Sequence, residues 1–342
     1  MKIAVDAMGG DFAPKQIVLG AIAAAKQLDC EIVLVGDQDK VQAELDKNPD
    51  WRKLKIEIHH AGDVIGMDEH PGAAVRRKKD SSIVVATRLV KEGTCDAVLS
   101  AGSTGAAVAS ALFGLGRIKG VDRPTIATPI PTVSGATLLL DSGANVDSKP
   151  HHLLQSAMMG AIYYEYVFGV KRPRVGLLNI GEEPTKGNEQ ALATYPLLEK
   201  NKSINFTGNA EGRDIPKGTF DVVVCDGFVG NVVLKFAEGL AKTILKLIKD
   251  AVRDGGVFAK LGALLLAPAL KKLAKRVDAA EYGGAPLLGV NGCYIICHGS
   301  SNAKSIQSAI NVANEYVKNN VLEHIKDGIA EEEVLNNDNQ EK

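Results

Sequence analysis

The sequence predicts an α/β fold with a doubly wound, mostly parallel sheet. Strand-like apolar runs alternate with helix-like runs along the whole chain, as in repeated strand–helix–strand units. The 342 residues include 35 glycines and only 5% aromatic residues, which suits buried parallel strands joined by tight turns. No proline- or serine-rich linker divides the chain, so we expect a single large domain over residues 1–330.

The first half of this domain is expected to hold four strands, at residues 2–9, 31–37, 54–60 and 97–99. Helices are expected after them, at residues 16–27, 39–46, about 73–92 and 106–115. Pro14 opens the first of these helices, because proline is favoured at the first helical turn. Ser81-Ser82 can interrupt the third helix.

The second half continues the alternation. Strands are expected at residues 125–131, 137–141, 174–180, 203–208, 221–225 and 294–297. Helices are expected at residues 151–167, 189–200 and 231–253, and a final helix is expected to end at Ile329. The acidic tail over residues 331–342 is expected to be disordered.

Composition narrows the class of function. The formal net charge is −1, so no global field draws the protein to nucleic acid. The first strand follows the initial Met directly and no apolar run reaches the length of a membrane span, so we expect a cytoplasmic protein. The five cysteines stand mostly in apolar runs, as reduced buried thiols do. Cys293, Cys297 and His298 lack zinc-site spacing, so we expect no metal and no cofactor.

One glycine-rich stretch, Ser100 to Ala107, reads as strand, tight turn and helix start. Backbone amides at a helix N-terminus form an anion site, and here they would come from Gly102, Ser103, Thr104 and Gly105. The alternative is a tight turn that binds no ligand, because short glycine motifs also occur by chance.

Six predicted strands end in small or polar residues. In an open parallel sheet these ends line one crevice, which is where ligands bind. The six together favour a polar, glycine-rich cleft. They are Asp6 to Asp11, Ser100 to Gly105, Asp141 to Asn145, Asn179 to Glu182, Asp226 to Asn231 and His298 to Ser301. Their aspartates, Asp6, Asp11, Asp141 and Asp226, either act as bases or, as we favour, anchor loops.

The cleft lacks the signatures of common sites. There is no dinucleotide fingerprint, no nucleoside-triphosphate loop and no serine-hydrolase elbow. A covalent serine or cysteine enzyme is therefore not supported, and positioning with charge stabilisation fits better. Lys186 is either a phosphate-binding charge or a solvated surface lysine, and Asn231 is either a ligand group or a helix cap. His298 is either a hydrogen-bond donor or acid/base, or a satisfied half-buried histidine.

Two basic segments stand outside the strand ends. The run Arg76, Arg77, Lys78 and Lys79 lies on a predicted helix, where part of it faces solvent and two members can face the cleft or an acidic partner. Residues 255–277 carry five cations and no acid, and Pro268 is expected to break or kink them into two short helices. The region 251–284 is then a protruding helical element for membrane or dimer contact, with contacts at Leu264, Leu265, Leu266, Lys271 and Lys272.

These stretches together resemble the phosphate acyltransferases of bacterial phospholipid synthesis. The matching stretches occur in collinear order over nearly the full chain. They are Val5 to Asp11, Arg76 to Lys79 with Ser81-Ser82, Ser100 to Ala106, Gly120 to Pro124 near Thr132 to Ser134, Leu140 to Asp147, Lys186 to Glu189, Asp226 to Asn231 and His298 to Ser301. The family often has Asn at the position of Ser103, so this chain departs from the pattern there.

The resemblance implies a fold like that of phosphotransacetylases and the isocitrate/isopropylmalate dehydrogenase group. It also implies a homodimer at the inner face of the cytoplasmic membrane, which passes a long-chain acyl group from acyl carrier protein to inorganic phosphate. The acyl phosphate would supply a membrane glycerol-3-phosphate acyltransferase. No protein nucleophile is needed, because phosphate itself attacks the thioester.

On this reading each candidate residue takes a role. The Gly102–Gly105 backbone, Lys186 and Ser300 bind phosphate, and Asn231 and His298 orient the carbonyl or the phosphate. The Arg76–Lys79 run contacts the acidic carrier protein or its phosphopantetheine. Two alternatives stay open, namely an NAD- and metal-dependent decarboxylating dehydrogenase on the same fold and a non-catalytic membrane scaffold.

Overall fold

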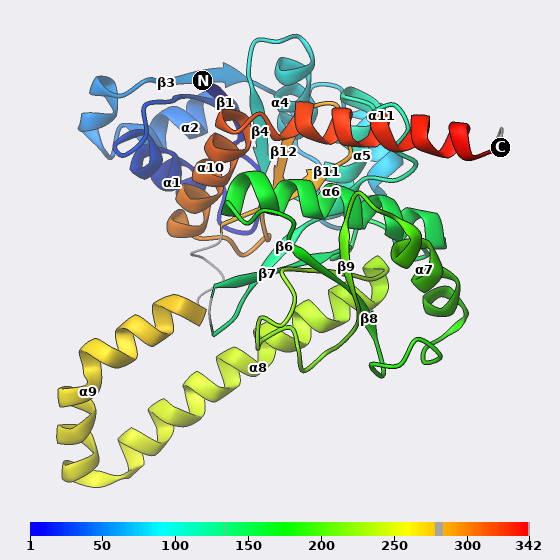
Figure 1. The fold of residues 1–342 in the computed structure, drawn as a ribbon. Coiled ribbons are helices and arrows are strands. Elements are labelled where there is room, and N and C mark those ends of the chain that lie inside the picture. The colour runs from blue at the N-terminus through cyan, green and yellow to red at the C-terminus, as the bar shows by residue number, and fades with distance from the viewer. Residues whose placement is uncertain (134, 278–282, 341–342) are drawn as a thin grey trace.

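The computed structural model describes residues 1–133, 135–277 and 283–340, with the side chains of residues 272–277 and 335–340 left out. It contains a seven-stranded and a five-stranded sheet (Figure 1). The first has the order β3-β2-β1-β4-β12-β11-β5, and the second has the order β6-β7-β10-β8-β9. The expected mostly parallel α/β architecture is confirmed, but the strands form two sheets rather than one.

The first sheet contains the chain's first and last strands. Its members are β3 (Ile56–His60), β2 (Glu31–Gly36), β1 (Lys2–Asp6), β4 (Ala97–Ser100), β12 (Cys293–Ile296), β11 (Ala285–Leu288) and β5 (Thr125–Ile126). The pairs from β3 to β12 are parallel, while β11 runs antiparallel to both of its neighbours. Strand β11 was not predicted, because its four residues include a proline and follow a long helical segment.

The second sheet is built from the middle of the chain. Its members are β6 (Thr128–Pro131), β7 (Ala136–Leu140), β10 (Val222–Val224), β8 (Arg174–Asn179) and β9 (Asn205–Glu211). The predicted strand over residues 125–131 divides at Ala127, because β5 pairs with β11 of the first sheet and β6 pairs with β7 of the second. That division is where the chain passes from one sheet to the other.

Helices connect and cover these strands. The first part holds α1 (Lys15–Ala25), α2 (Gln38–Leu45), the 3-10 helix η1 (Pro49–Lys53), α3 (Pro71–Arg77), α4 (Ser82–Lys91) and α5 (Thr104–Gly114). The later part holds α6 (Pro150–Phe168), α7 (Glu189–Lys200), α8 (Gly227–Asp254), α9 (Gly256–Val277), α10 (Ala303–Lys318) and α11 (Val321–Gln340). The predicted helix over 73–92 is two helices, α3 and α4, separated near the Ser81-Ser82 pair that allowed a break.

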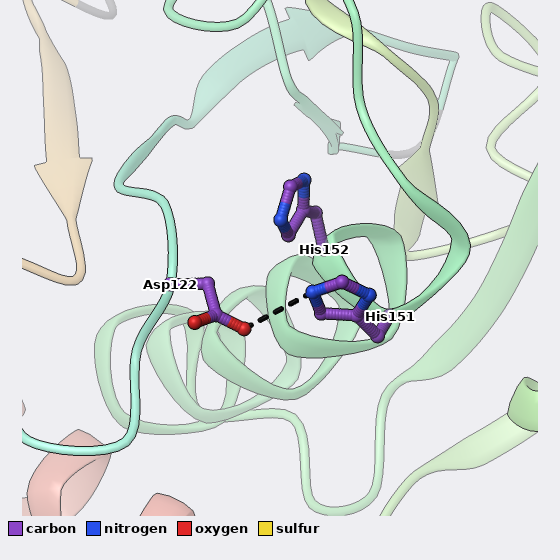
Figure 2. A group of neighbouring side chains, drawn as sticks. All are labelled: Asp122, His151 and His152. Atoms are coloured by element: carbon purple, nitrogen blue, oxygen red, sulfur yellow. Dashed lines mark ion pairs between the residues drawn. The ribbon is translucent and has the colours of Figure 1, made fainter.

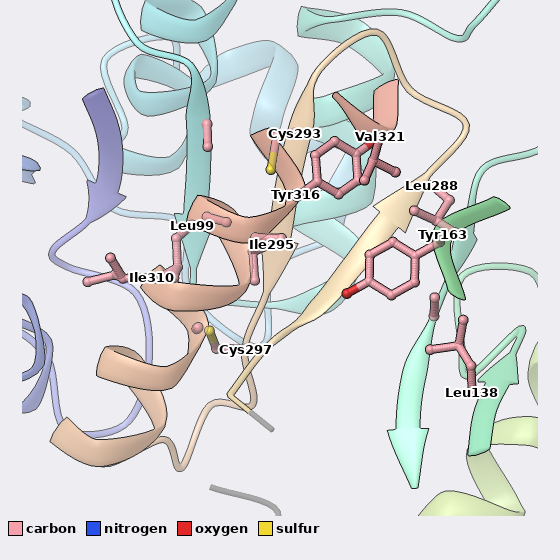
Figure 3. Close-up of a cluster of buried hydrophobic side chains, with 14 of the residues drawn as sticks. Leu99, Leu138, Tyr163, Leu288, Cys293, Ile295, Cys297, Ile310, Tyr316 and Val321 are labelled. Carbon is pink, nitrogen blue, oxygen red and sulfur yellow. The ribbon is translucent and has the colours of Figure 1, made fainter. Parts of the chain in front are cut away.

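One cluster of buried side chains joins the two sheets. It contains Leu99 of β4, Ile295 of β12 and Leu138 of β7, together with Tyr163 of α6 (Figure 3). Ile310 of α10 closes the cluster on the first sheet. Because these side chains come from both sheets, the two sheets share a core and hold their strand ends in a fixed relation.

Helices α8 and α9 extend away from the two sheets as a helical hairpin (Figure 1). The break between them falls at Gly255 and Gly256, where Gly256 has a φ of +70°. Pro268 lies inside α9, which is one helix, so the expected division into two short helices is wrong, while the bend of α9 fits the expected kink. Among the described residues, none of the helices combines the length and the apolarity that a bilayer span needs.

The C-terminal helix α11 is longer than expected. It continues through Gln340, whereas the sequence predicted a helix end at Ile329 and disorder over 331–342. The stretch after Ile329 contains no proline or glycine, and its run Ala330-Glu-Glu-Glu333 consists of good helix formers. Residues 341–342 lie outside the described residues.

Candidate active site

Three loops meet at the carboxyl ends of the adjacent strands β1, β4 and β12. The Asp11 amide donates to the Gly299 carbonyl at 2.8 Å, and the Cys297 amide donates to the Ser100 carbonyl at 2.8 Å. A Cβ built on Gly9 would lie 2.8 Å from the Gly102 nitrogen, so only glycine fits there. This edge brings together the loops that carry Gly102–Gly105 and His298 with Ser300.

The start of α5 offers free backbone amides. Ser103 is the N-cap residue, but its side chain makes no cap hydrogen bond. The first bond of the helix runs from the Ala107 amide to the Ser103 carbonyl at 2.9 Å, so the amides of residues 104–106 point out of the helix end. The Gly102 amide was predicted to contribute to the anion site, but it donates to Ser100 Oγ at 3.1 Å inside the protein. The amides suited to an anion are therefore those from Thr104 onward.

His298 and Ser300 lie on the third loop and are both exposed. His298 Nδ1 accepts the Ser300 amide at 3.1 Å and lies 2.8 Å from Ser300 Oγ. Because Nδ1 accepts a backbone amide, the proton of the neutral ring is on Nε2. The geometry thus presents His298 Nε2–H as a donor at the same edge as the α5 amides.

The second sheet supplies a further loop, formed by residues 141–145 after β7. The Asp141 carboxylate is 1% exposed and accepts the amides of Gly143, Ala144 and Asn145 at 3.1, 3.0 and 2.7 Å. It also accepts the Ile126 amide at 3.1 Å, which fixes this loop against the first sheet. Burial raises the pKa of the Asp141 carboxyl, and the amide donors oppose that rise.

Asn231 lies half-buried in the first turns of α8, beside the β7 loop. A Cβ built on Gly143 would lie 3.6 Å from Asn231 Cγ. Asn231 is not the helix cap, because Asp226 accepts the Phe228 and Val229 amides at 2.9 Å each. The loop-anchoring interpretation therefore holds for Asp226 as it does for Asp141, and the Asn231 amide group is not used as the cap.

Lys186 lies in the exposed loop between β8 and α7. Its carbonyl accepts from Asn179 Nδ2 at 2.9 Å, and its amide donates to the Glu183 carbonyl at 3.1 Å. Backbone contacts thus order the loop while the ammonium group faces solvent. The structure places the predicted catalytic and phosphate-binding residues in three groups: the α5 and β12 loops, the β7 loop with Asn231, and the Lys186 loop.

The basic run at residues 76–79 divides when it folds. Lys78 Nζ lies 2.8 Å from Glu69 Oε1 and also donates to the Val64 carbonyl at 2.7 Å, so it anchors a neighbouring loop. This contact lowers the pKa of Glu69 and raises the pKa of Lys78. Arg77 pairs with Glu69 at 3.0 Å, and the Arg76 guanidinium lies over the Phe113 ring. Lys78 therefore has its partners within the chain, whereas Arg76 and Lys79 are exposed.

One further polar cluster was not predicted. His151 Nε2 lies 3.1 Å from Asp122 Oδ2, with the His152 ring beside them (Figure 2). The His152 Nδ1 accepts the Lys149 amide at 3.0 Å, so its other nitrogen carries the proton. A metal-bound histidine normally donates from its second nitrogen, so these bonds fit a helix cap and an ion pair better than a metal centre.

The helical hairpin carries the predicted membrane contacts. Leu264, Leu265 and Leu266 are 71%, 83% and 58% exposed, and Lys271 is exposed as well. The Lys272 side chain lies outside the described residues. Along α8, apolar side chains recur at helical spacing and stay exposed, as at Val232, Phe236, Leu240, Ile244 and Leu247.

Comparison with known proteins decides among the open alternatives. Residues 1–324 match the protein family described as "Fatty acid synthesis protein". The phosphate acyltransferase of Pelotomaculum thermopropionicum is 58% identical over 334 residues, covering 98% of this chain and 96% of that protein. The phosphate acyltransferase of Desulfitobacterium hafniense is 59% identical over 327 residues, covering 95% and 97% of the two chains. This chain belongs to the phosphate acyltransferase family.

Solved structures agree on the fold. A phosphotransacetylase from Streptococcus pyogenes superposes with a TM-score of 0.59 at 17% identity, covering 93% of this chain and 94% of that one. A branched-chain phosphotransacylase from Enterococcus faecalis has a TM-score of 0.54 at 13% identity, covering 93% and 99%. The predicted fold group is thereby confirmed.

Membership in the phosphate acyltransferase family settles the class of reaction. The protein is an acyltransferase that transfers an acyl group to phosphate, in a family described by its role in fatty acid synthesis. The dehydrogenase and the non-catalytic scaffold are therefore no longer supported. The predictions for individual site residues remain predictions.

Proposed function

We propose that this acyltransferase moves a long-chain fatty acyl group from acyl carrier protein to inorganic phosphate. The product is an acyl phosphate, which a membrane glycerol-3-phosphate acyltransferase would consume. The single observation that carries the proposal is the uncapped start of α5, whose outward amides lie at the same edge as the His298 and Ser300 loop. A phosphate dianion suits such an end, because the helix dipole and free N–H groups favour negative charge.

The cysteines support direct attack by phosphate rather than a thioester on the enzyme. All five are buried, and burial raises the pKa of Cys95 to about 11 and that of Cys297 to about 12. A thiol with so high a pKa stays protonated near neutral pH and is a poor nucleophile. A large part of inorganic phosphate is already dianionic near neutral pH, so it can attack the thioester without a strong base.

The remaining candidates have roles in stabilising charge. His298 Nε2–H can donate to the thioester carbonyl oxygen or to the leaving pantetheine thiolate. Lys186 supplies a mobile cation for phosphate, and the Asn231 amide orients the carbonyl or the phosphate. Ser300 supplies a hydroxyl for phosphate from the loop that also carries His298. Exposed Arg76 and Lys79 suit the acidic surface of the carrier protein.

The hairpin of α8 and α9 supports an attachment role. Its exposed apolar stripe along α8 suits a second copy of the chain, and its leucine-rich, basic α9 suits an anionic bilayer surface. We therefore propose a homodimer that works in the cytoplasm, peripherally bound to the inner face of the membrane.

Product analysis tests the reaction. The protein is incubated with acyl-acyl carrier protein and labelled phosphate, and formation of labelled acyl phosphate is the expected result. Lys186→Ala and Asn231→Ala should each lower the transfer rate by about tenfold or more while the protein stays folded. Lys200→Ala, an exposed lysine at the end of α7, is the matched control and should keep the rate. Near-normal rates in both site variants would refute these roles.

Liposome sedimentation tests membrane attachment. Leu265→Glu should release the protein from vesicles that contain anionic lipid, because it puts a charge into an apolar contact. Leu192→Glu, on α7 of the body and also exposed, should leave binding unchanged. Equal sedimentation of wild type and Leu265→Glu would contradict attachment through α9.

A further inference from the structure

A buried carboxylate lies beneath the loop that leads into α5. Asp6 ends β1 and is 2% exposed, and its Oδ2 accepts from Ser100 Oγ at 2.7 Å. Ser100 Oγ in turn accepts the Gly102 amide at 3.1 Å. A hydroxyl can donate only one hydrogen bond. Because the Ser100 hydroxyl donates that bond to Asp6, its oxygen lone pairs are left to accept the Gly102 N–H. The orientation of the loop thus depends on a chain of two hydrogen bonds.

The residues around these two hydrogen bonds are tightly packed. Ser100 is fully buried, and Asp6 Oδ1 accepts the Met8 amide at 3.2 Å. A Cβ built on Gly9 would lie 2.5 Å from Asp6 Oδ2 and 2.8 Å from the Gly102 nitrogen, so the β1 and β4 loops pack backbone to backbone. Gly102 is two residues before Thr104, where the outward amides of α5 begin.

We propose that Asp6, acting through Ser100, is a positioning residue for acyl transfer to phosphate. The pair fixes the Gly102 amide and so aims the outward amides of residues 104–106 at the bound phosphate. This inference rests on the proposed function of the α5 amides as the phosphate site.

Phosphate kinetics of Ser100→Ala test the proposal. The variant should raise the KM for inorganic phosphate by about five- to tenfold, as expected for losing one buried hydrogen bond that holds a binding loop, with a smaller change in kcat. Ser110→Ala is the matched control, because Ser110 lies on α5 itself and its buried hydroxyl is 2.7 Å from Thr87 Oγ1. Ser110→Ala should keep the wild-type KM.

Asp6 variants provide an independent readout. Asp6→Ala should raise the KM for phosphate as Ser100→Ala does, and combining the two should add little, because both break the same chain. Asp6→Asn keeps a polar partner for the Ser100 hydroxyl, which can rotate, so it should restore a KM near that of wild type. Unchanged KM values in folded Ser100→Ala and Asp6→Ala would overturn the proposal, as would equal KM values for Asp6→Ala and Asp6→Asn.

Direct titration with inorganic phosphate separates this inference from the proposed reaction. If the wild type binds phosphate but makes no acyl phosphate, the proposed reaction fails. A five- to tenfold weaker phosphate affinity of Ser100→Ala would still support the positioning role in that case. Equal phosphate affinities of wild type and Ser100→Ala would refute the positioning role whatever the reaction.

Discussion

Each sheet has a buried aspartate at the carboxyl end of an interior strand, Asp6 in β1 and Asp141 directly after β7, but the two carboxylates differ in their partners. Asp141 binds backbone amides of its own loop directly, at Gly143, Ala144 and Asn145, and adds the Ile126 amide from the other sheet. Asp6 accepts the Met8 amide of its own loop and reaches the neighbouring loop through the Ser100 hydroxyl. Amide donors are fixed in direction, whereas a hydroxyl can rotate.

This difference separates a binding role from a structural role. The binding role belongs to the strand ends of the first sheet, called the first edge here, and the structural role to the strand ends of the second sheet, the second edge. The amides of the β7 loop donate to Asp141, so the group available to a ligand there is the neighbouring side chain of Asn231. In the β4 loop the Gly102 amide donates to Ser100 Oγ, while the later amides at the start of α5 point outward. We infer that the first edge binds the anion and that the second edge is a rigid support for one side chain.

The largest expected effect breaks the second edge. Asp141→Ala leaves the amides of residues 126, 143, 144 and 145 without their acceptor, so the free energy of unfolding should fall by about 3–5 kcal/mol. Denaturant titration measures this change. Asp147→Ala, at an exposed aspartate just after the same loop, is the control and should change stability by less than about 0.5 kcal/mol. A loss of under about 1 kcal/mol in Asp141→Ala would contradict the structural role.

A smaller loss is expected at the first edge. Asp6→Ala removes the acceptor of the Met8 amide, but the Ser100 hydroxyl can turn to another partner, so we expect about 1–3 kcal/mol. The same denaturant titration applies. If Asp6→Ala lost as much stability as Asp141→Ala, the contrast between fixed and rotating donors would not hold.

The sequence could predict much of this contrast but not its details. Glycines and aspartates after apolar runs were enough to place Asp6, Asp141 and Asp226 at loop anchors. The crossing at Ala127 and the short strand β11 were missed, because strand pairing between residues far apart is decided by tertiary contacts rather than by local pattern. The role of Lys78 was missed for a similar reason, since its partner Glu69 comes from a preceding loop. The only local signal for Ser100 is a polar residue at the end of a buried strand.

The dependence of stability on pH distinguishes the ionised carboxylate from a neutral one. Burial raises the pKa of Asp6 above its usual range, so the folded protein holds this proton more tightly than the unfolded chain does. Stability contributed by Asp6 is therefore present below the usual carboxyl pKa and is lost as pH rises to the raised pKa, by at most about 1.4 kcal/mol per pH unit. Relative to Asp6→Asn, the wild type should lose stability as pH rises through that interval. If the wild type instead gained stability relative to Asp6→Asn as pH rose, the raised pKa of Asp6 would be contradicted.

The smallest expected change in stability is at Asn231. It tests whether the β7 loop keeps its structure without this side chain. Asn231→Ala removes an amide that is not the helix cap, because Asp226 already accepts the first amides of α8. We expect the free energy of unfolding to change by less than about 0.5 kcal/mol, with the effect confined to the transfer rate. Asp226→Ala is the comparison, and loss of its cap should cost about 1 kcal/mol. If Asn231→Ala were the less stable of the two, Asn231 would be part of the support that holds the β7 loop, and the assignment of that support to Asp141 would have to include it.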